Sequence, residues 1–185
     1  MFRIRGDSMF TLPLHVVRTT NWKEKKKQIK KIIDYKKIEK KGLHTFGTDR
    51  QNDGKSYIKD FVRIFKEELD DWLSEIKKDD CLITDLWTVR YKRGEFQAVH
   101  NHGTFGYSGI LYLDFDPKLH ETTTFVSPFN DPFNDYLSWY NPNNIQEGDI
   151  LFFPSVVLHH FYPNTSFITR RCVVFDIKFP VTVKP

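Results

Sequence analysis

The sequence predicts a mainly β fold, a sandwich or barrel, preceded by helices. From Cys81 onward, short apolar and β-branched runs alternate with turn residues, which is typical of many short strands that build two sheets. Before Cys81, apolar residues instead recur every three or four positions, which is the period of a helix with one buried face. We therefore expect a single domain over residues 1–185, with a helical portion at 1–80 and the β core at 81–185.

The helical portion is expected to hold two helices. The first follows Asn21, whose side chain can cap it, and extends through WKEKKKQIKKIIDYKKIEKK to Gly42. The second covers about residues 56–78, and its apolar stripe is wide enough to pack against one face of a sheet. This second stripe consists of Ile58, Phe61, Val62, Phe65, Leu69, Trp72, Leu73 and Ile76.

In the β core, each apolar run that alternates with polar residues or is rich in β-branched residues is predicted as a strand. The predicted strands cover residues 82–92, 96–102, 107–115, 122–128, 148–155 and 172–179. Between the fourth and the fifth, the segment Pro128–Asn144 is rich in Asn, Asp and Pro, so we expect a long loop there. Its aromatic residues would form either a lid over a substrate or a contact with the helices.

The charge pattern and the cysteines limit the partners and the compartment. The net charge is +4, and lysines concentrate between Lys23 and Lys41. This segment could be a nucleic-acid-binding arm, but it lacks arginine and has few aromatic residues, so we interpret it as a solvated helix face and expect no nucleic acid partner. No apolar run is long enough for a transmembrane helix, and we expect no membrane partner. Cys81 and Cys172 lie in no metal or redox motif, which predicts free thiols and a cytoplasmic protein.

A pair of histidines stands at the start of the apolar segment HNHGTFGYSGILYL. If residues 96–102 are extended, the side chains of His100 and His102 lie on the same face of a strand. Such a pair supplies two of the ligands of a metal site, and a third ligand must come from elsewhere in the chain. The candidates are His159 and His160 in LHHFYPN.

Arg170 opens the last apolar strand. A guanidinium that enters an apolar strand needs an anionic partner, because a buried unpaired charge is costly. Arginine is suited to bidentate binding of a carboxylate. The same region therefore predicts a site for a carboxylate.

Together these pieces resemble the iron(II)- and 2-oxoglutarate-dependent oxygenases, over roughly Asp85 to Phe179. The stretches that carry the resemblance are, in the family's order, WTVRYKRGEF, HNH, SGILYL, GDILFFPSVVLHHFYPNTS and TRRCVVFDI. The set is most similar to a prolyl-hydroxylase-like branch of bacterial and phage members with an H-x-H motif. The resemblance implies a double-stranded β-helix, that is, a cupin-like jelly roll, with N-terminal helices packed on the sheet.

Within this resemblance, His100 matches the first metal ligand of the family. His159 matches the distal ligand, because its spacing from LFFPS and from PN fits better than that of His160. His102 stands at the position of the usual carboxylate, where the family has His-x-Asp or His-x-Glu. The resemblance thus implies Fe(II) bound by His100, His102 and His159, with three imidazoles in place of two imidazoles and a carboxylate.

The cosubstrate residues also follow from the resemblance. Arg170 matches the residue that pairs with the distal carboxylate of 2-oxoglutarate, whereas Arg171 is expected to point to the opposite side of the strand. Tyr112 matches a tyrosine that hydrogen-bonds the same carboxylate in prolyl-hydroxylase-like members, and Tyr91 stands where some members place another tyrosine that contacts 2-oxoglutarate. From the residues alone, both tyrosines are equally compatible with core packing.

The implied activity is that of an Fe(II)/2-oxoglutarate-dependent dioxygenase that uses 2-oxoglutarate and O2 as cosubstrates and hydroxylates a peptidyl residue or a small molecule. No catalytic residue beyond the metal ligands is implied. Because an imidazole rather than a small residue replaces the carboxylate, halogenation is not expected. Two alternatives stay open: a three-histidine, cupin-type dioxygenase that does not use 2-oxoglutarate, and a non-catalytic metal-binding interaction module.

Overall fold

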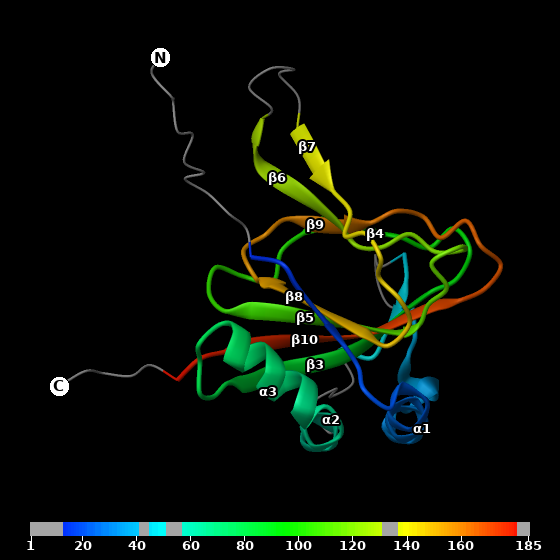
Figure 1. Cartoon of the computed structure of the whole chain (residues 1–185). Coiled ribbons are helices and arrows are strands. Elements are labelled where there is room, and N and C mark those ends of the chain that lie inside the picture. Colours follow the sequence, from blue (N-terminus) through cyan, green and yellow to red (C-terminus); the bar gives the residue numbers. More distant parts are fainter. Residues whose placement is uncertain (1–12, 41–44, 51–56, 131–136, 181–185) are drawn as a thin grey trace, which may run out of the picture.

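The computed structural model describes residues 13–40, 45–50, 57–130 and 137–180. Two antiparallel sheets face each other, and the helices lie on the outer side of the larger sheet (Figure 1). The larger sheet has the strand order β1-β8-β5-β10-β3-β2, and the smaller sheet has the order β4-β9-β6-β7. In the described part of the chain, no helix is both long enough and apolar enough to cross a membrane.

The larger sheet consists of β1 (His15–Arg18), β2 (Gly47–Thr48), β3 (Leu82–Tyr91), β5 (Tyr107–Asp114), β8 (Asp149–Pro154) and β10 (Arg170–Lys178). The smaller sheet consists of β4 (Gln97–His100), β6 (Thr124–Asn130), β7 (Leu137–Tyr140) and β9 (His159–Phe161). From β3 to β10 the chain passes back and forth between the two sheets, with β6 and β7 forming a hairpin within the smaller one. This topology is a double-stranded β-helix, so the predicted fold is confirmed.

The larger sheet separates two apolar cores, because its side chains alternate between its two faces. On β10, Val173 and Phe175 face the helices, whereas Cys172 and Val174 face the smaller sheet. On the helix side, the indole of Trp72 stacks on the ring of Phe152 with their centroids 4.3 Å apart. The second core lies between the sheets, and this is the side that carries the candidate site.

The first helix is shorter than predicted. It covers α1 (Trp22–Ile32), and a 3-10 turn, η1 (Tyr35–Lys37), follows it. Ile29 and Ile33 are one turn apart and both buried, but Ile38 is five residues further, or about 1.4 turns, so a continued helix would turn it away from the core. The chain therefore becomes extended at Ile33 and buries Ile38 in the same cluster. Asn21 is the N-cap residue of α1, as predicted, but it adopts a left-handed conformation and its side chain makes no cap hydrogen bond.

The second predicted helix is two helices, α2 (Ile58–Ile64) and α3 (Lys66–Glu75). The chain leaves helical geometry at Phe65, which is fully buried and packs on Phe61 at 4.7 Å between ring centroids. The apolar stripe predicted from the sequence does face the larger sheet, since Phe61 also contacts Phe175 of β10.

Four short strands escaped the sequence prediction: β1, β2, β7 and β9. Each of these four strands has only two to four residues and lies in no longer alternating run, whereas β4, which is equally short, lies within the predicted run of residues 96–102. The predicted loop Pro128–Asn144 is wrong in part, since β6 extends to Asn130 and β7 begins at Leu137. Residues 131–136 of that segment lie outside the described residues, so the predicted lid remains a prediction.

Candidate metal centre

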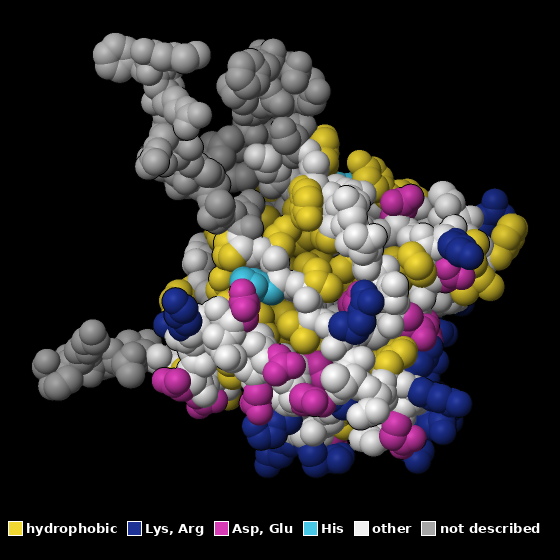
Figure 2. Space-filling model, in the orientation of Figure 1, with side chains coloured by type: hydrophobic (Ala, Val, Ile, Leu, Met, Phe, Trp, Pro, Cys, Tyr) yellow, Lys and Arg dark blue, Asp and Glu magenta, His cyan; other side chains and the backbone are white. Residues whose placement is uncertain are grey.

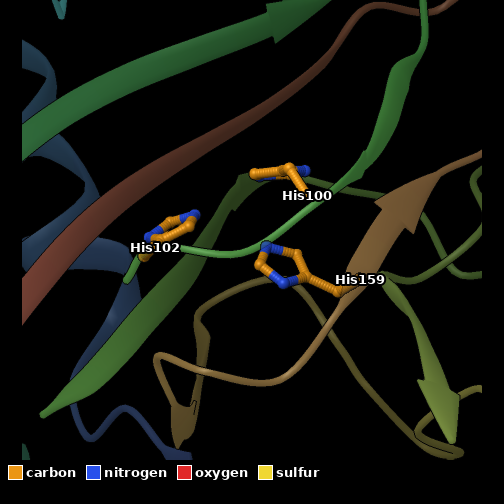
Figure 3. A group of neighbouring side chains, drawn as sticks. All are labelled: His100, His102 and His159. Carbon is orange, nitrogen blue, oxygen red and sulfur yellow. The ribbon is translucent and has the colours of Figure 1, made fainter. Parts of the chain in front are cut away.

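Three histidines meet between the two sheets. One ring nitrogen from each of His100, His102 and His159 lies within 4.8 Å of the others. Figure 3 shows the three imidazoles arranged around a common space. His100 ends β4, His159 begins β9, and these two residues pair directly across the smaller sheet. Within the described residues, the structure thus brings together the three histidines that the sequence analysis selected.

His102 reaches the site by a different route from the one predicted. β4 ends at His100, so the two histidines do not share a strand, and the strand-face argument is wrong. The backbone N–H of His102 instead donates to the carbonyl oxygen of Ser155 at 2.9 Å. The loop then passes so close to β10 at Gly106 that a Cβ atom would lie 2.2 Å from the carbonyl oxygen of Ile177. Gly106 has a φ of 99°, which glycine adopts readily.

The Nδ1 atom of each histidine lies against a hydrogen-bond acceptor. The pairs are His100 Nδ1 with the Ala98 carbonyl at 2.9 Å, His159 Nδ1 with the Val157 carbonyl at 2.9 Å, and His102 Nδ1 with Asp176 Oδ1 at 2.7 Å. An acceptor at Nδ1 places the ring proton there and leaves the lone pair on Nε2, the atom that can bind a metal. The arrangement therefore fixes the tautomer that a metal centre needs.

Burial keeps two of these rings neutral. It lowers the pKa of His100 to about 4 and, with the neighbouring His100 ring as a second cause, the pKa of His159 to about 3. Neutral imidazole is the form that binds a metal, and it suits Fe(II) as well as Zn(II) and Ni(II). The donor set thus fits a divalent first-row metal ion.

Arg170 lies in the wall of the same cavity as the histidines. Its side chain is only 2% exposed, its Nε atom has no hydrogen-bond partner, and no carboxylate of the described residues lies within ion-pair distance of it. Aromatic rings surround its guanidinium, with Phe161 at 4.0 Å and Tyr91 and Tyr112 at 5.3 Å. A buried cation without an anion is costly, so this position suits an anionic ligand.

Arg171 points the other way, as predicted. Its guanidinium donates to Asp114 at 2.9 Å on the helix side of the larger sheet. Asp114 also binds Lys26 and Lys30 of α1. Figure 2 shows basic and acidic side chains interspersed on the part of the surface where Figure 1 places the helices. The lysine-rich segment is thus partly neutralised by the sheet beneath it.

The two candidate tyrosines differ in position. Tyr91 lines the cavity, and its hydroxyl donates to the side-chain carbonyl of Gln97. Tyr112 does not line the cavity. Its ring lies 5.3 Å from the Arg170 guanidinium, and its hydroxyl donates to Thr123 Oγ1 at 3.3 Å. Burial raises the pKa of both hydroxyls, which keeps them protonated and able to donate a hydrogen bond.

Gln97 lies between His100 and Tyr91 in the cavity and contacts both. Its amide nitrogen lies 2.8 Å from Nε2 of His100, while its amide oxygen accepts from Tyr91. The space between these side chains is about 20 Å³, which is room for about one water molecule. A dicarboxylate can enter only when a lining side chain moves, and rotation of Gln97 would free Nε2 of His100 at the same time.

His160 lies on the outer face of the smaller sheet. It pairs with Thr124, and its ring packs against Trp139 and Tyr162 at 5.3 and 4.5 Å between centroids. The grouping of the histidines therefore favours His159 over His160 as the third ligand, as the spacing did. Sequence analysis missed Gln97 and Asp176. An aspartate inside the apolar strand CVVFDIKF is the same kind of signal as Arg170, and it could have identified Asp176.

A sequence model described as "Putative 2OG-Fe(II) oxygenase" matches residues 85–176. This chain belongs to the 2OG-Fe(II) oxygenase family. The matched segment contains every candidate ligand and cosubstrate residue named above. The family acts with iron(II) and 2-oxoglutarate, so these are the metal and the cosubstrate of the enzyme. The comparison with curated protein sequences gives no match.

Solved structures of this family share the fold. The carbocyclase SnoK from nogalamycin biosynthesis, described as non-heme and alpha ketoglutarate dependent, superposes with a TM-score of 0.67 at 11% identity, over 89% of this chain and 79% of that chain. HygX from Streptomyces hygroscopicus, with nickel and 2-oxoglutarate bound, gives 0.64 at 12% identity, over 93% and 84%. A viral collagen prolyl hydroxylase from Paramecium Bursaria Chlorella virus-1 gives 0.59 at 14% identity, over 89% and 94%.

Proposed function

We propose that this oxygenase hydroxylates an uncharged organic group, that the three histidines hold the iron, and that Arg170 holds 2-oxoglutarate. The observation that carries the proposal is the pairing of two features in one cavity. At one end stand three imidazoles that are kept in the metal-binding tautomer. In the wall beside them is a buried guanidinium without an acidic partner.

Each residue has a defined task in this proposal. When bound, iron(II) supplies the activation of O2 that is coupled to the conversion of 2-oxoglutarate to succinate and CO2. The Nε2 atoms of the three histidines would hold the metal, and a three-ligand site would leave positions open for the cosubstrates. Arg170 donates to the distal carboxylate of 2-oxoglutarate, and the Tyr112 hydroxyl is the nearby donor that can turn from Thr123 to the same group. The aromatic wall around Arg170 excludes water.

The substrate proposal rests on an apolar pocket next to His159. It has a volume of about 360 Å³. Its lining consists of Leu14, Phe125, Val126, Ser127, Trp139, Tyr140 and Val157. Phe125 packs on the ring of His159 at 5.9 Å, and the carbonyl of Val157 holds Nδ1 of His159, so the pocket adjoins one of the proposed ligands. A lining without charged side chains favours an uncharged group, either a peptidyl side chain or a small molecule.

The proposal separates this protein from the two alternatives. A cupin-type dioxygenase that does not use 2-oxoglutarate has no use for a buried guanidinium beside its metal. A non-catalytic binding module does not need a metal site with positions left open for cosubstrates. Nucleic acid is not proposed as a partner, because Lys26 and Lys30 bind Asp114 of the sheet. Both cysteines are free thiols, Cys81 partly and Cys172 fully buried, which supports a reducing compartment, and we propose the cytoplasm.

The deciding experiment measures succinate formed from 2-oxoglutarate by the Fe(II)-loaded protein, with and without candidate substrates. Slow formation is expected without substrate, and faster formation with a peptide or small molecule that fits the apolar pocket. Arg170→Met should abolish it, and Arg171→Met should not. Oxygen consumption with no succinate would contradict the proposal and would favour the dioxygenase that does not use 2-oxoglutarate.

A further inference from the structure

We propose that Asp176 is the carboxylate of this metal centre, placed behind His102 instead of on the metal. The inference rests on the proposed role of the three histidines as ligands. In this role Asp176 is a positioning residue: it holds the ring of His102 and supplies the negative charge that the family's carboxylate ligand would bring.

The geometry around His102 carries the inference. Its Nδ1 atom lies 2.7 Å from Oδ1 of Asp176, whereas the other two histidines lie against backbone carbonyls. The side chain of His102 is 3% exposed, and its ring packs on the indole of Trp87 at 5.3 Å between centroids. His102 is therefore the one ligand of the three that is held by a charged side chain.

Asp176 lies on the same face of β10 as the residues that line the cavity, next to His102. On β10 it follows Arg170, Cys172 and Val174 along the face that turns toward the smaller sheet. Ser108 Oγ donates to the same Oδ1 atom at 2.8 Å, and Ser108 also bonds to Ser155. The carbonyl of Ser155 in turn accepts from the backbone of His102. Asp176 and His102 are thus joined by a side-chain contact and by a route through two serines.

No cation among the described residues fully neutralises Asp176. The nearest is Arg50, whose guanidinium is 3.7 Å from Oδ2 and closer to Asp85 at 3.4 Å. The Arg50 side chain is also 46% exposed, so its charge is screened by solvent. His102 is therefore the closer of the two electrostatic partners of Asp176, at 2.7 Å against 3.7 Å for Arg50.

The chemistry explains how a third imidazole can replace a carboxylate. A neutral ligand at position 102 leaves the bound metal with one more unit of positive charge. A carboxylate that accepts the Nδ1 proton raises the donor strength of Nε2 and restores one negative charge close to the metal. The total charge then equals that of two histidines and one carboxylate, although the carboxylate lies outside the coordination sphere.

The test measures the affinity of the full chain for Ni(II) by competition with a chelator. Asp176→Asn keeps the shape of the side chain and removes its charge, and we expect about 10- to 100-fold weaker binding. Asp114→Asn is the control, because Asp114 also lies beside β10 but pairs with Arg171, Lys26 and Lys30 on the helix side of the larger sheet. The control should bind Ni(II) as the wild type does.

A second background distinguishes a metal role from a structural one. In His102→Asp a carboxylate stands at the metal and Asp176 no longer has an imidazole to hold. Adding Asp176→Asn to that variant should weaken Ni(II) binding much less than it does in the wild-type background, because no imidazole at position 102 depends on Asp176. An equal loss from Asp176→Asn in both backgrounds would show that Asp176 only supports the fold, and it would overturn the inference.

The inference can also be tested without a variant. Imidazole 15N–1H NMR spectra of the Zn(II)-loaded wild type should show His102 protonated at Nδ1 and bound through Nε2. The opposite tautomer would overturn the role of Asp176. If His159→Ala abolishes binding but Asp176→Asn does not weaken it, the inference fails and the proposed function stands. If the wild type binds no metal, both fail.

Discussion

Neighbouring residues of the same type have different surroundings on the two faces of β9 and β10. His159 and Arg170 face the space between the sheets, while His160 and Arg171 face outward. Arg171 has an acidic partner in Asp114, whereas Arg170 is buried with none among the described residues. The difference teaches that residue type does not identify a functional residue here. Of the two arginines, the buried one without an acidic partner among the described residues suits an anionic ligand, and of the two histidines the one grouped with His100 and His102 suits the metal.

The largest expected effect separates the two histidines of β9. His159→Ala should weaken Ni(II) binding by roughly 100-fold or more, since losing a ligand costs at least as much as losing a residue that supports one. His160→Ala should leave the affinity within about a factor of two, because His160 lies on the outer face. Calorimetric titration of both variants checks this, and a similar loss in the two would contradict the assignment of His159.

The next effect separates the two arginines of β10. In the wild type with metal bound, 2-oxoglutarate at 100 times its Kd should stabilise the fold by about 2.7 kcal/mol. Arg170→Met should remove this stabilisation, yet without 2-oxoglutarate the variant should melt no lower than the wild type, because it loses an unpaired buried charge and keeps its volume.

Arg171→Met is the matched control for that experiment. It should keep the full response to 2-oxoglutarate. Thermal melts of the metal-loaded proteins, with and without 2-oxoglutarate, measure both quantities. An unchanged response in Arg170→Met would remove Arg170 from the cosubstrate site.

The interior histidines should also make the metal-free fold sensitive to acid. Their pKa values, about 4 for His100 and about 3 for His159, lie below the value near 6.5 expected in the unfolded chain. Between these values the unfolded state binds more protons than the folded state, so the contribution to stability is complete above about pH 6.5 and falls as the pH drops toward about 3. Urea midpoints of the metal-free protein at a series of pH values check this. The double variant His100→Ala/His159→Ala should show a flatter profile.

The smallest effect is expected at Asp114, on the helix side of the larger sheet. Asp114→Asn should cost about 1 kcal/mol or less of stability, because its pairs with Arg171, Lys26 and Lys30 are partly exposed. Metal and 2-oxoglutarate binding should stay unchanged. Chemical denaturation together with the two binding titrations checks both parts, and a loss of 2-oxoglutarate binding would show that the two faces are coupled.

Local patterns were enough to predict most long elements. β3, β5, β8 and β10 are long enough for their apolar runs to show, and the stripe of α2 and α3 follows the helical period. The break at Phe65 and the end of α1 at Ile32 were not predictable in this way, since each depends on which residues the core accepts. β9 is three residues long and carries no pattern of its own, although it holds His159.

The sequence by itself determined the order of the motifs and the two pairs of adjacent candidates, His159–His160 on β9 and Arg170–Arg171 on β10. The spacing of the family's motif was enough to choose His159 from the first pair. Only the tertiary structure decided how His102 arrives and what holds it. His102 and Asp176 are 74 residues apart in the chain, and their contact exists because β10 runs beside β5 and the loop after β4 crosses its end. Spacing along a chain encodes local geometry, whereas a partner on a distant strand is set by the packing of the two sheets.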